Sequence, residues 1–192
     1  MIDSKKILDS FDGNLPIFPL PDFVMFPKTA YSFNVYEERY KDLITDVLEN
    51  NKLFCTSMLE PCTNEEYLES PTFNRIGTLC YVLEHSKLKN GNYNIVVSGL
   101  KKIKIIKENN SNKSYRNVEV AILNDSNFIC KEELKRKKLV NKFISLISPN
   151  DKIDLKLIDS SLISTEILTN LGCLILPLDN HDKQKLLELT DV

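Results

Sequence analysis

The hairpin that sets the fold class lies in residues 76–97, which read IGTLCYVLEHSKLKNGNYNIVV. Two runs rich in β-branched and aromatic residues flank the dipeptide Asn90-Gly91, which is a strong signal for a tight two-residue turn. This arrangement predicts two antiparallel strands. Toward the C-terminus, residues 100–106 alternate lysine with isoleucine and residues 115–123 resume the strand pattern, so the sheet is expected to extend that far.

The segment before the hairpin adds short strands and one helix. Residues 15–21 contain three prolines, which cannot donate a hydrogen bond to a sheet, so this segment is expected at an edge or in an extended conformation. Residues 23–26 are apolar and end at Pro27. Residues 30–36 alternate polar and apolar side chains, as a half-buried strand does. Residues 37–48 carry apolar side chains at helical spacing, and residues 53–59 form a further candidate strand.

The order of these elements indicates the architecture. About seven short strands with a single early helix, and without a repeated strand–helix–strand order, favour a mixed or antiparallel barrel-like sheet. Residues 60–75 are polar and contain two prolines, which predicts a long surface loop. Helical spacing dominates later, first around Val140 and then in residues 162–176 and 179–189. We therefore expect an α+β chain with an N-terminal tail (1–13), a β domain (14–125) and a C-terminal helical subdomain (126–192).

Composition excludes several classes of protein. Of the 192 residues, 42% are hydrophobic, which is typical of a globular chain and not of a disordered one. The 25 basic and 27 acidic residues nearly balance, so the sequence has no overall electrostatic signature for nucleic acid. The five cysteines contain no C-x-x-C pair, and no apolar run is long enough to span a bilayer. We expect a soluble cytoplasmic protein with free thiols and no membrane partner.

The motifs of common enzymes are missing from the sequence. There is no phosphate-binding glycine loop and no G-x-S-x-G nucleophile motif, so no catalytic residue and no cofactor is predicted. His85 and His181 are expected at the surface, and no metal site is predicted because such a site needs three or four ligands. Ser86 has a lysine three residues later, at serine–lysine spacing, and Cys62 is expected in an exposed loop. A small hydrolase using Ser86 or Cys62 therefore stays open as the weakest alternative.

A second alternative involves the lysine-rich strand. Residues 101–107 place several lysines beside isoleucines, which is typical of a strand with a cationic outer face. No aromatic side chains that could stack on bases are interleaved with them, so a solvated face is the better interpretation and nucleic acid is not the expected partner. An RNA-binding role through these residues stays open; they are Lys101, Lys102, Lys104 and Lys107.

An aromatic cluster near the N-terminus is the most suggestive feature for binding. Most of its members are expected in the core; they are Phe18, Phe23, Met25, Phe26, Tyr31, Phe33, Tyr36 and Tyr40. The proline-bounded segment 23–27 is nevertheless expected to leave one or two large apolar side chains at the surface. An exposed apolar patch indicates a site for protein or peptide. The predicted peptide-binding residues are Phe23, Met25, Phe26 and Pro27.

Three motifs, LPIFPL at 15–20, VMFP at 24–27 and YEERY at 36–40, together resemble the opening of the N-terminal substrate-binding domain of Lon proteases. The resemblance continues, in order, through shorter motifs at residues 76–78, 91–99, 102–105 and 182–192. It implies a PUA-like β domain followed by a small helical bundle. It also implies a non-catalytic module that binds unfolded or exposed apolar protein segments, with a Lon-type protease or another protein as partner. Because complete Lon proteases add an ATPase and a protease module, the resemblance implies a stand-alone member without them.

The resemblance carries over no catalytic residue and implies structural roles for the residues of the motifs. Arg39 is expected to orient a helix end by bonding to a carboxylate or carbonyl group. Phe18, Leu20 and Phe26 are expected to fill the barrel, and Gly77 and Gly99 to relieve backbone strain. Lys28 stands where the family often has glycine. The motif residues with an implied structural role are Leu15, Pro16, Phe18, Pro19, Leu20, Glu38, Arg39, Tyr40, Gly77 and Gly99.

Overall fold

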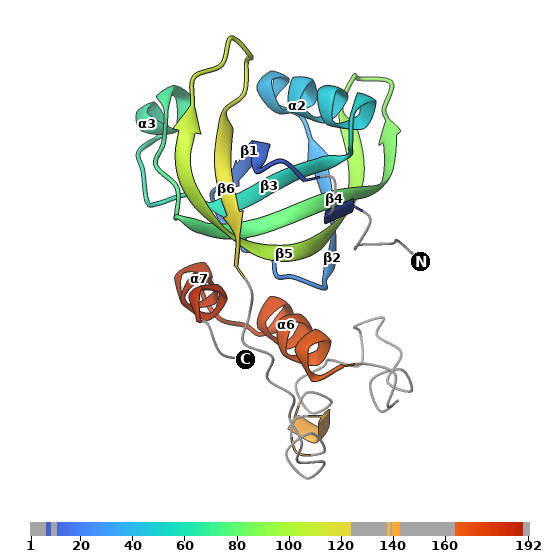
Figure 1. Ribbon diagram of the computed structural model, residues 1–192, viewed down its shortest axis with the longest axis vertical. Coiled ribbons are helices and arrows are strands. Elements are labelled where there is room, and N and C mark those ends of the chain that lie inside the picture. Colours follow the sequence, from blue (N-terminus) through green and yellow to red (C-terminus); the bar gives the residue numbers. More distant parts are fainter. Residues whose placement is uncertain (1–6, 9–10, 124–137, 139, 143–163, 190–192) are drawn as a thin grey trace.

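A computed structural model describes residues 7–8, 11–123, 138, 140–142 and 164–189 of the chain (Figure 1). Its strands are β1 (Asn14–Leu20), β2 (Ala30–Val35), β3 (Leu53–Met58), β4 (Ile76–Lys87), β5 (Tyr93–Asn109) and β6 (Asn117–Ile122). Its helices are α2 (Glu38–Glu49), α3 (Asn64–Glu69), α6 (Thr165–Ile175) and α7 (Asn180–Glu188). The predicted helix around Val140 lies mostly outside the described residues.

The strands form one mixed sheet that closes into a barrel. Its order is β2-β5-β4-β3-β1-β6, and β6 pairs back onto β5. The β1–β3 pair is parallel and the other pairs are antiparallel. The long strand β5 makes closure possible, because its first part pairs with β2 and its last part with β6. The predicted barrel-like sheet is confirmed.

The β4–β5 hairpin is present, but its loop is longer than the predicted two residues. The amide of Leu88 donates to the carbonyl of Asn92 at 2.8 Å, and the amide of Gly91 donates to the carbonyl of Leu88 at 2.9 Å. Gly91 has a φ of +84°, the left-handed conformation that glycine adopts without steric cost. Three residues therefore separate the last paired positions, which is the turn-plus-bulge hairpin and not the two-residue one.

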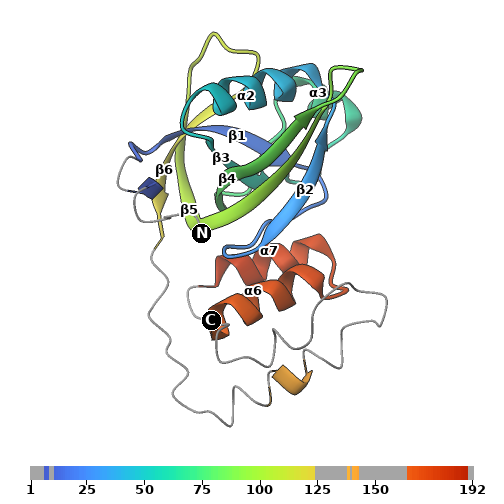
Figure 2. The ribbon, with the colours of Figure 1, turned by 90° about the vertical axis from the view of Figure 1, so that its right-hand side faces the viewer.

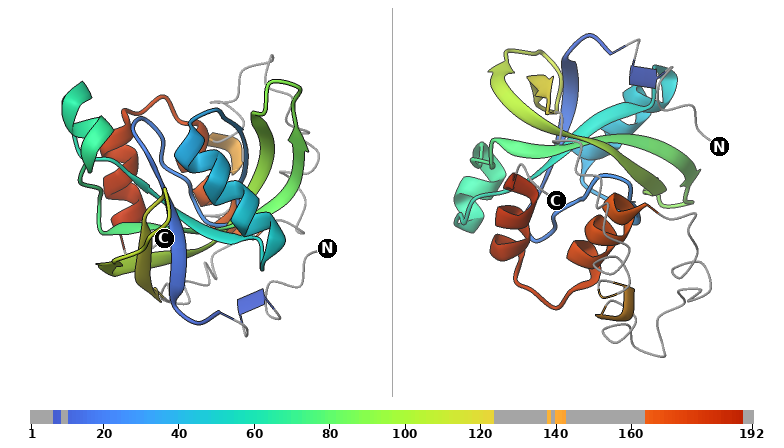
Figure 3. Two further views of the ribbon diagram at one scale, coloured as in Figure 1. Left: turned by 90° about the horizontal axis from the view of Figure 1, so that it is seen from above. Right: turned by 60° about the horizontal axis from the view of Figure 1, so that its bottom comes forward.

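Helix α2 forms because its apolar side chains recur on one face, and that face covers one mouth of the barrel (Figure 3). The buried side chains of α2 are those of Tyr40, Leu43, Ile44 and Val47. They belong to the apolar cluster that contains Phe18. A second cluster, which includes Leu15, Ile17, Leu79 and Ile103, fills the remainder of the barrel.

The sequence predicted a surface loop over residues 60–75, but this segment contains the short helix α3. The hydroxyl of Thr63 accepts a hydrogen bond from the amide of Glu66 at 3.3 Å, and the carboxylate of Glu66 accepts one from the amide of Thr63 at 2.7 Å. This capping box satisfies two amides at the start of α3. The S/T-x-x-E pattern that marks such a box was present in the sequence.

Helices α6 and α7 lie together beneath the end of the barrel opposite α2 (Figures 1 and 2). Leu187 of α7 is buried in a cluster with Phe26 and Met58 of the barrel. The side-chain amide of Gln184 donates to the carbonyl of Ile76 at 3.0 Å. Both predicted C-terminal helices are therefore present and packed against the β domain. No helix among the described residues is long and apolar enough to cross a membrane.

The loop between β5 and β6 is held against α2 by two carboxylates, and the hydroxyl of Ser114 donates to the carboxylate of Asp42 at 2.7 Å. Asp46 accepts hydrogen bonds from the hydroxyl of Tyr115 at 2.6 Å and from Nζ of Lys113 at 2.8 Å. The hydrogen bond from Lys113 has the largest effect on the pKa of Asp46 and the bond from Tyr115 the next largest, and together they lower this pKa below its usual range.

Replacing Asp46 by asparagine is expected to reduce the pH dependence of stability on the acid side. A carboxyl group with a lowered pKa stabilises the folded chain above its unfolded pKa, and this stabilisation is lost as pH falls through the folded pKa. The destabilisation caused by Asp46→Asn should therefore be larger at neutral pH than at acidic pH, and should stay under about 1 kcal/mol because the pair is partly exposed. Urea unfolding at both pH values measures it, with Glu49→Gln on the same helix as control. Equal destabilisation at both pH values would contradict the assignment.

Candidate functional site

The segment 21–29, called the strap below, connects β1 to β2 and is tied to the barrel. The hydroxyl of Thr78 donates to the carbonyl of Met25 at 2.6 Å. The amide of Lys28 donates to the carbonyl of Gly99 at 2.9 Å, and the amide of Gly99 donates to the carbonyl of Thr29 at the same distance. The strap therefore lies along β4 and β5 and is joined to them by these three hydrogen bonds.

Three of the four predicted binding residues are buried, because the strap is held against the barrel. Met25 and Phe26 are only 2% and 1% exposed, and Pro27 is also buried. Met25 packs in the cluster beneath α2, whereas Phe26 packs against Leu187 of the C-terminal part. None of the three can contact a peptide on the surface of this structure, so the expectation that they are exposed is wrong. Phe23 remains partly exposed.

Lys28 closes the strap in a left-handed conformation, with a φ of 61°. A residue with a β-carbon is unfavourable there, and glycine is not. Lys28→Gly is expected to raise the free energy of unfolding by about 0.5 kcal/mol, since the relief of strain exceeds the entropy that glycine adds to the unfolded chain. Urea unfolding measures this change. Lys104→Gly, an exposed lysine within β5, is the control and is expected to be destabilising; the same loss in Lys28→Gly would contradict the explanation.

Three aromatic rings meet at the surface where the strap joins β2, and we call them the aromatic triad: Phe23, Tyr31 and Phe33. The ring centroids are 4.3 Å apart for Phe23–Tyr31, 5.3 Å for Phe23–Phe33 and 5.0 Å for Tyr31–Phe33. Tyr31 is 43% exposed, whereas Phe23 and Phe33 are half-buried. Phe18 supports the triad from the core, with its ring centroid 6.1 Å from that of Phe33. The triad is a firmly packed apolar surface that is open on one side.

The strand that carries two of these rings lies at a margin of the sheet. Among the strands that the structure describes, β2 pairs only with β5. A shallow hollow of about 450 Å³ adjoins it and is lined by Ala30, Tyr31, Ser32 and Val96. Sequence reasoning included Tyr31 and Phe33 in the aromatic cluster but not among the binding residues. The alternation of residues 30–36 was the signal, because it placed both rings on one face of a strand.

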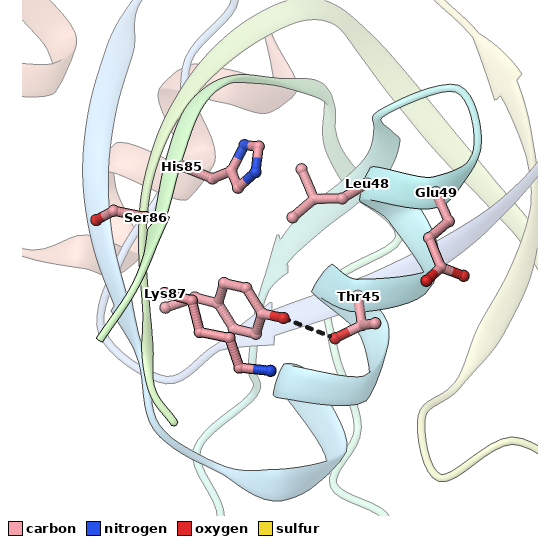
Figure 4. A pocket seen from close by; sticks show the side chains of 7 residues that line it. Thr45, Leu48, Glu49, His85, Ser86 and Lys87 are labelled. Carbon is pink, nitrogen blue, oxygen red and sulfur yellow. Dashed lines mark hydrogen bonds between the residues drawn. The ribbon is translucent and has the colours of Figure 1, made fainter. Parts of the chain in front are cut away.

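A second hollow, of about 370 Å³, lies between the end of α2 and the tips of β4 and β5 (Figure 4). The hydroxyl groups of Thr45 and Tyr93 are hydrogen-bonded at 3.1 Å, and this bond lowers the pKa of Tyr93. His85 points toward α2, whereas Ser86 points away from His85 (Figure 4). Because these two side chains leave β4 on opposite faces, His85 cannot serve as a base for Ser86.

The lysine-rich strand also differs from the expected cationic face. Lys102 is only 6% exposed, and its Nζ donates to the carbonyl of Leu189, just after α7, at 2.5 Å. Lys107 forms an ion pair with Glu119 at 3.1 Å. The expectation that Lys102 shares a solvated face with Lys104 is therefore wrong, because Lys102 is buried against the residue that follows α7. Lysines that are engaged in this way offer less charge to phosphates than the sequence indicated.

The YEERY motif builds a structural junction between α2 and α3. Nε of Arg39 donates to the carboxylate of Glu37 at 3.1 Å, and the hydroxyl of Tyr67 donates to the same carboxylate at 2.6 Å. The guanidinium carbon of Arg39 lies 4.7 Å from the ring centroid of Tyr40 and 5.1 Å from that of Tyr67. Burial, and then the Glu37 carboxylate, raise the pKa of Tyr67 to about 12, so its phenol stays protonated as a donor. Glu38 is exposed and pairs with Lys41.

The remaining motif residues lie in the barrel wall. Leu15, Phe18, Pro19 and Leu20 are buried, and Pro16 is half-buried.

The two motif glycines permit close contact between backbones and do not relieve strain. Neither Gly77 nor Gly99 has a positive φ, so the expected role in backbone strain is wrong. A β-carbon at Gly77 would lie 2.2 Å from the carbonyl oxygen of Thr56, and one at Gly99 would lie 2.3 Å from the carbonyl oxygen of Phe26. Gly99 is thus the residue that lets the strap cross β5.

Comparison with known proteins identifies the family of this fold. Residues 14–192 match the family described as the ATP-dependent protease La (LON) substrate-binding domain. The Lon protease of Buchnera aphidicola subsp. Acyrthosiphon pisum (strain APS) is 26% identical over 181 residues, which are 93% of this chain and 23% of that protease. The chain thus spans about a quarter of the length of this relative.

Two solved structures share the fold. The Lon N-terminal domain protein from Xanthomonas campestris superimposes with a TM-score of 0.65 at 18% identity, covering 93% of this chain and 91% of that one. The N-terminal domain of the Mycobacterium avium complex Lon protease gives the same TM-score at 13% identity, covering 92% of this chain and 90% of that one. The resemblance seen in the sequence motifs is confirmed over the β domain and the C-terminal helices. The chain belongs to the LON substrate-binding domain family.

Proposed function

We propose that this chain is a non-catalytic module that binds unfolded or exposed apolar segments of other proteins, and that the aromatic triad is its contact surface. The observation that carries the proposal is the packing of Phe23, Tyr31 and Phe33 into one surface that solvent still reaches. Membership of a substrate-binding family supports a role in recognition.

The physical properties of the triad suit this role. Aromatic rings remove a large apolar area from water when they are covered, and they lose few rotamers in doing so. Because Phe18 holds Phe33 from beneath, little ordering is required when a ligand arrives. A patch of this kind recognises apolar character and not one particular sequence, which is what binding to unfolded segments requires.

Two further aspects of the proposal concern partners and location. The relatives that match this chain are Lon proteases, so we propose a Lon-type protease as a partner that would receive the bound segment. We also propose a cytoplasmic location. It is supported by Cys55, Cys62, Cys80 and Cys173, which are free thiols as expected in a reducing compartment.

Substitution of the most exposed ring tests the proposed function. Tyr31→Ser is expected to weaken binding of a permanently unfolded, carboxymethylated protein by about tenfold, because it removes the outer third of the triad. Fluorescence anisotropy of the labelled unfolded protein measures the affinity. Tyr36→Ser is the matched control, since Tyr36 is 66% exposed and lies outside the triad; it is expected to leave the affinity within about twofold. Equal affinities for wild type and Tyr31→Ser would refute the proposed surface.

A further inference from the structure

We propose that the bound segment adds to the barrel as a strand, pairing antiparallel with the free edge of β2 while its apolar side chains cover the aromatic triad. The inference rests on the proposed function and specifies how the same surface would hold its ligand. The occupant is an extended segment of an unfolded protein in which apolar and polar residues alternate.

The ladder between β2 and β5 determines which backbone groups of β2 are free. The amide of Gly99 donates to the carbonyl of Thr29, whereas the carbonyl of Gly99 accepts from the amide of Lys28, so Thr29 is the last residue before β2 whose carbonyl bonds to β5. The same register continues from Ala30 opposite Ser98 to the end of the strand without an irregularity. Because antiparallel pairs alternate between bonded and non-bonded, the odd-numbered residues of β2 bond to β5 and the even-numbered residues do not.

The even-numbered residues are Ala30, Ser32 and Asn34, and all three are exposed. Their amides and carbonyls point away from β5, toward an edge with which no described strand pairs. Proteins usually protect such an edge with a charged residue, a proline or a bulge. The β2 sequence, AYSFNV, contains neither a charge nor a proline, and its pairing with β5 shows no bulge. The edge is therefore an unprotected template for another strand.

The side chains of β2 specify what the added strand should carry. Tyr31 and Phe33 lie on one face of β2, and an antiparallel partner places the residues opposite them on that same face. These would be non-hydrogen-bonded pairs, in which opposing side chains come closest. Apolar residues at every second position of the segment would thus cover the triad. The residues between them would face the exposed side chains of Ala30 and Ser32.

The charges beside β2 favour one direction of the added strand. Lys28 is exposed just before β2, and Glu38 is exposed shortly after it, with its carboxylate shared with Lys41. An antiparallel segment has its C-terminal end near Lys28 and its N-terminal end near Glu38. Basic residues at the start of the segment and acidic residues at its end therefore complement the flanks of β2.

Peptides methylated on selected backbone nitrogens test strand addition without changing the protein. The probe is the acetylated and amidated peptide KVTFSLTVE, in which apolar residues alternate with polar ones between a basic and an acidic end. In the proposed pairing the amides of its polar residues face β2. N-methylation of its two threonines is therefore expected to weaken binding by about tenfold or more, because each methyl group removes a hydrogen bond and adds a clash. N-methylation of its phenylalanine and leucine, whose amides face solvent, should change the affinity by no more than about twofold.

Two outcomes of the peptide comparison overturn the inference. Equal affinities of the two methylated peptides would show that backbone pairing does not contribute. The reverse order of affinities would indicate parallel pairing, in which the amides of the apolar residues face the edge. Hydrogen exchange gives an independent readout, since the amides of Ser32 and Asn34 should become protected when the unmodified peptide is added. Protection of Ser32 in a self-associated chain without peptide would assign the edge to a second copy and overturn the proposal.

The Tyr31→Ser variant separates failure of this inference from failure of the proposed function. If the variant binds the unmodified peptide as tightly as the wild type, the triad is not the contact surface and both proposals fail. If the variant binds weakly but the two methylated peptides bind equally well, the triad is the surface and strand addition alone is wrong. If an unfolded protein binds the triad and the unmodified peptide does not, strand addition is also wrong.

Discussion

Phe26→Ala is expected to lower the free energy of unfolding by about 3–5 kcal/mol, the range for truncating a buried phenylalanine. Phe26 is 1% exposed and lies between the barrel and α7, where it shares a cluster with Met58 and Leu187. Its removal would leave a cavity at the junction of the β domain and the C-terminal helices. The strap is fixed by backbone hydrogen bonds to Gly99, so it cannot easily collapse into that space. Urea unfolding followed by circular dichroism measures the loss.

The matched control for Phe26 is Phe23→Ala in the same strap. Phe23 is half-buried on the triad, so its truncation should cost about 1 kcal/mol and weaken binding of the unfolded protein. Phe26→Ala should show the opposite pattern. Its stability should fall strongly, whereas the molecules of the variant that remain folded should bind the unfolded protein with unchanged affinity. Equal losses of stability in the two variants would show that Phe26 is not the buried member of the pair.

Gly99→Ala is expected to cost about 3 kcal/mol of stability or more, although it adds a single methyl group. That group would lie 2.3 Å from the carbonyl oxygen of Phe26, so the strap or β5 would have to move. The Lys28–Gly99 and Gly99–Thr29 hydrogen bonds limit this movement. Thermal unfolding and urea unfolding both measure the effect. Because the strap carries Phe23, the variant is also expected to weaken binding to the triad.

The control for Gly99 separates steric overlap from backbone conformation. Gly91 has a φ of +84°, but nothing lies within 4 Å of a β-carbon placed there. Gly91→Ala should therefore lower the free energy of unfolding by only about 1 kcal/mol, because the left-handed backbone conformation is unfavourable for alanine but no atom is overlapped. If Gly99→Ala were as mild as Gly91→Ala, the close crossing of the strap over β5 would be incorrect.

Local patterns in the sequence were sufficient for much of the fold. The Asn90-Gly91 dipeptide placed the central hairpin, and the spacing of Tyr40, Leu43 and Ile44 placed α2 within one or two residues. These signals work because turn chemistry and helical periodicity act over a few neighbouring residues. The length of the hairpin loop was not predicted, since a turn with Gly91 at a bulge reads almost the same in sequence as a two-residue turn.

The candidate site was predicted less well because its burial depends on residues distant in sequence. Segment 23–27 is apolar and bounded by prolines, which are properties of an exposed loop and of a buried strap alike. Contacts from Thr78 and Gly99 decide between them by holding Met25 and Phe26 inside. Within the cluster of aromatic residues near the N-terminus, the exposed members are Tyr31 and Tyr36, whereas Phe23 and Phe33 are half-buried.

The lysine-rich strand illustrates the same limit. Alternation correctly placed Ile103 and Ile105 inside the barrel. The outward direction of Lys102 was taken as exposure to solvent, whereas Lys102 is buried and donates a hydrogen bond to the carbonyl of Leu189, just after α7. Periodicity defines the two faces of a strand, but it does not reveal what packs on the outer one.

The most direct test of the central claim is a nuclear magnetic resonance titration of the labelled chain with the carboxymethylated unfolded protein. The largest chemical-shift changes are expected at Phe23, Tyr31 and Phe33, with smaller changes at the exposed edge of β2. Changes centred instead on the hollow beside His85, or on the lysines of β5, with the triad resonances unmoved, would contradict it.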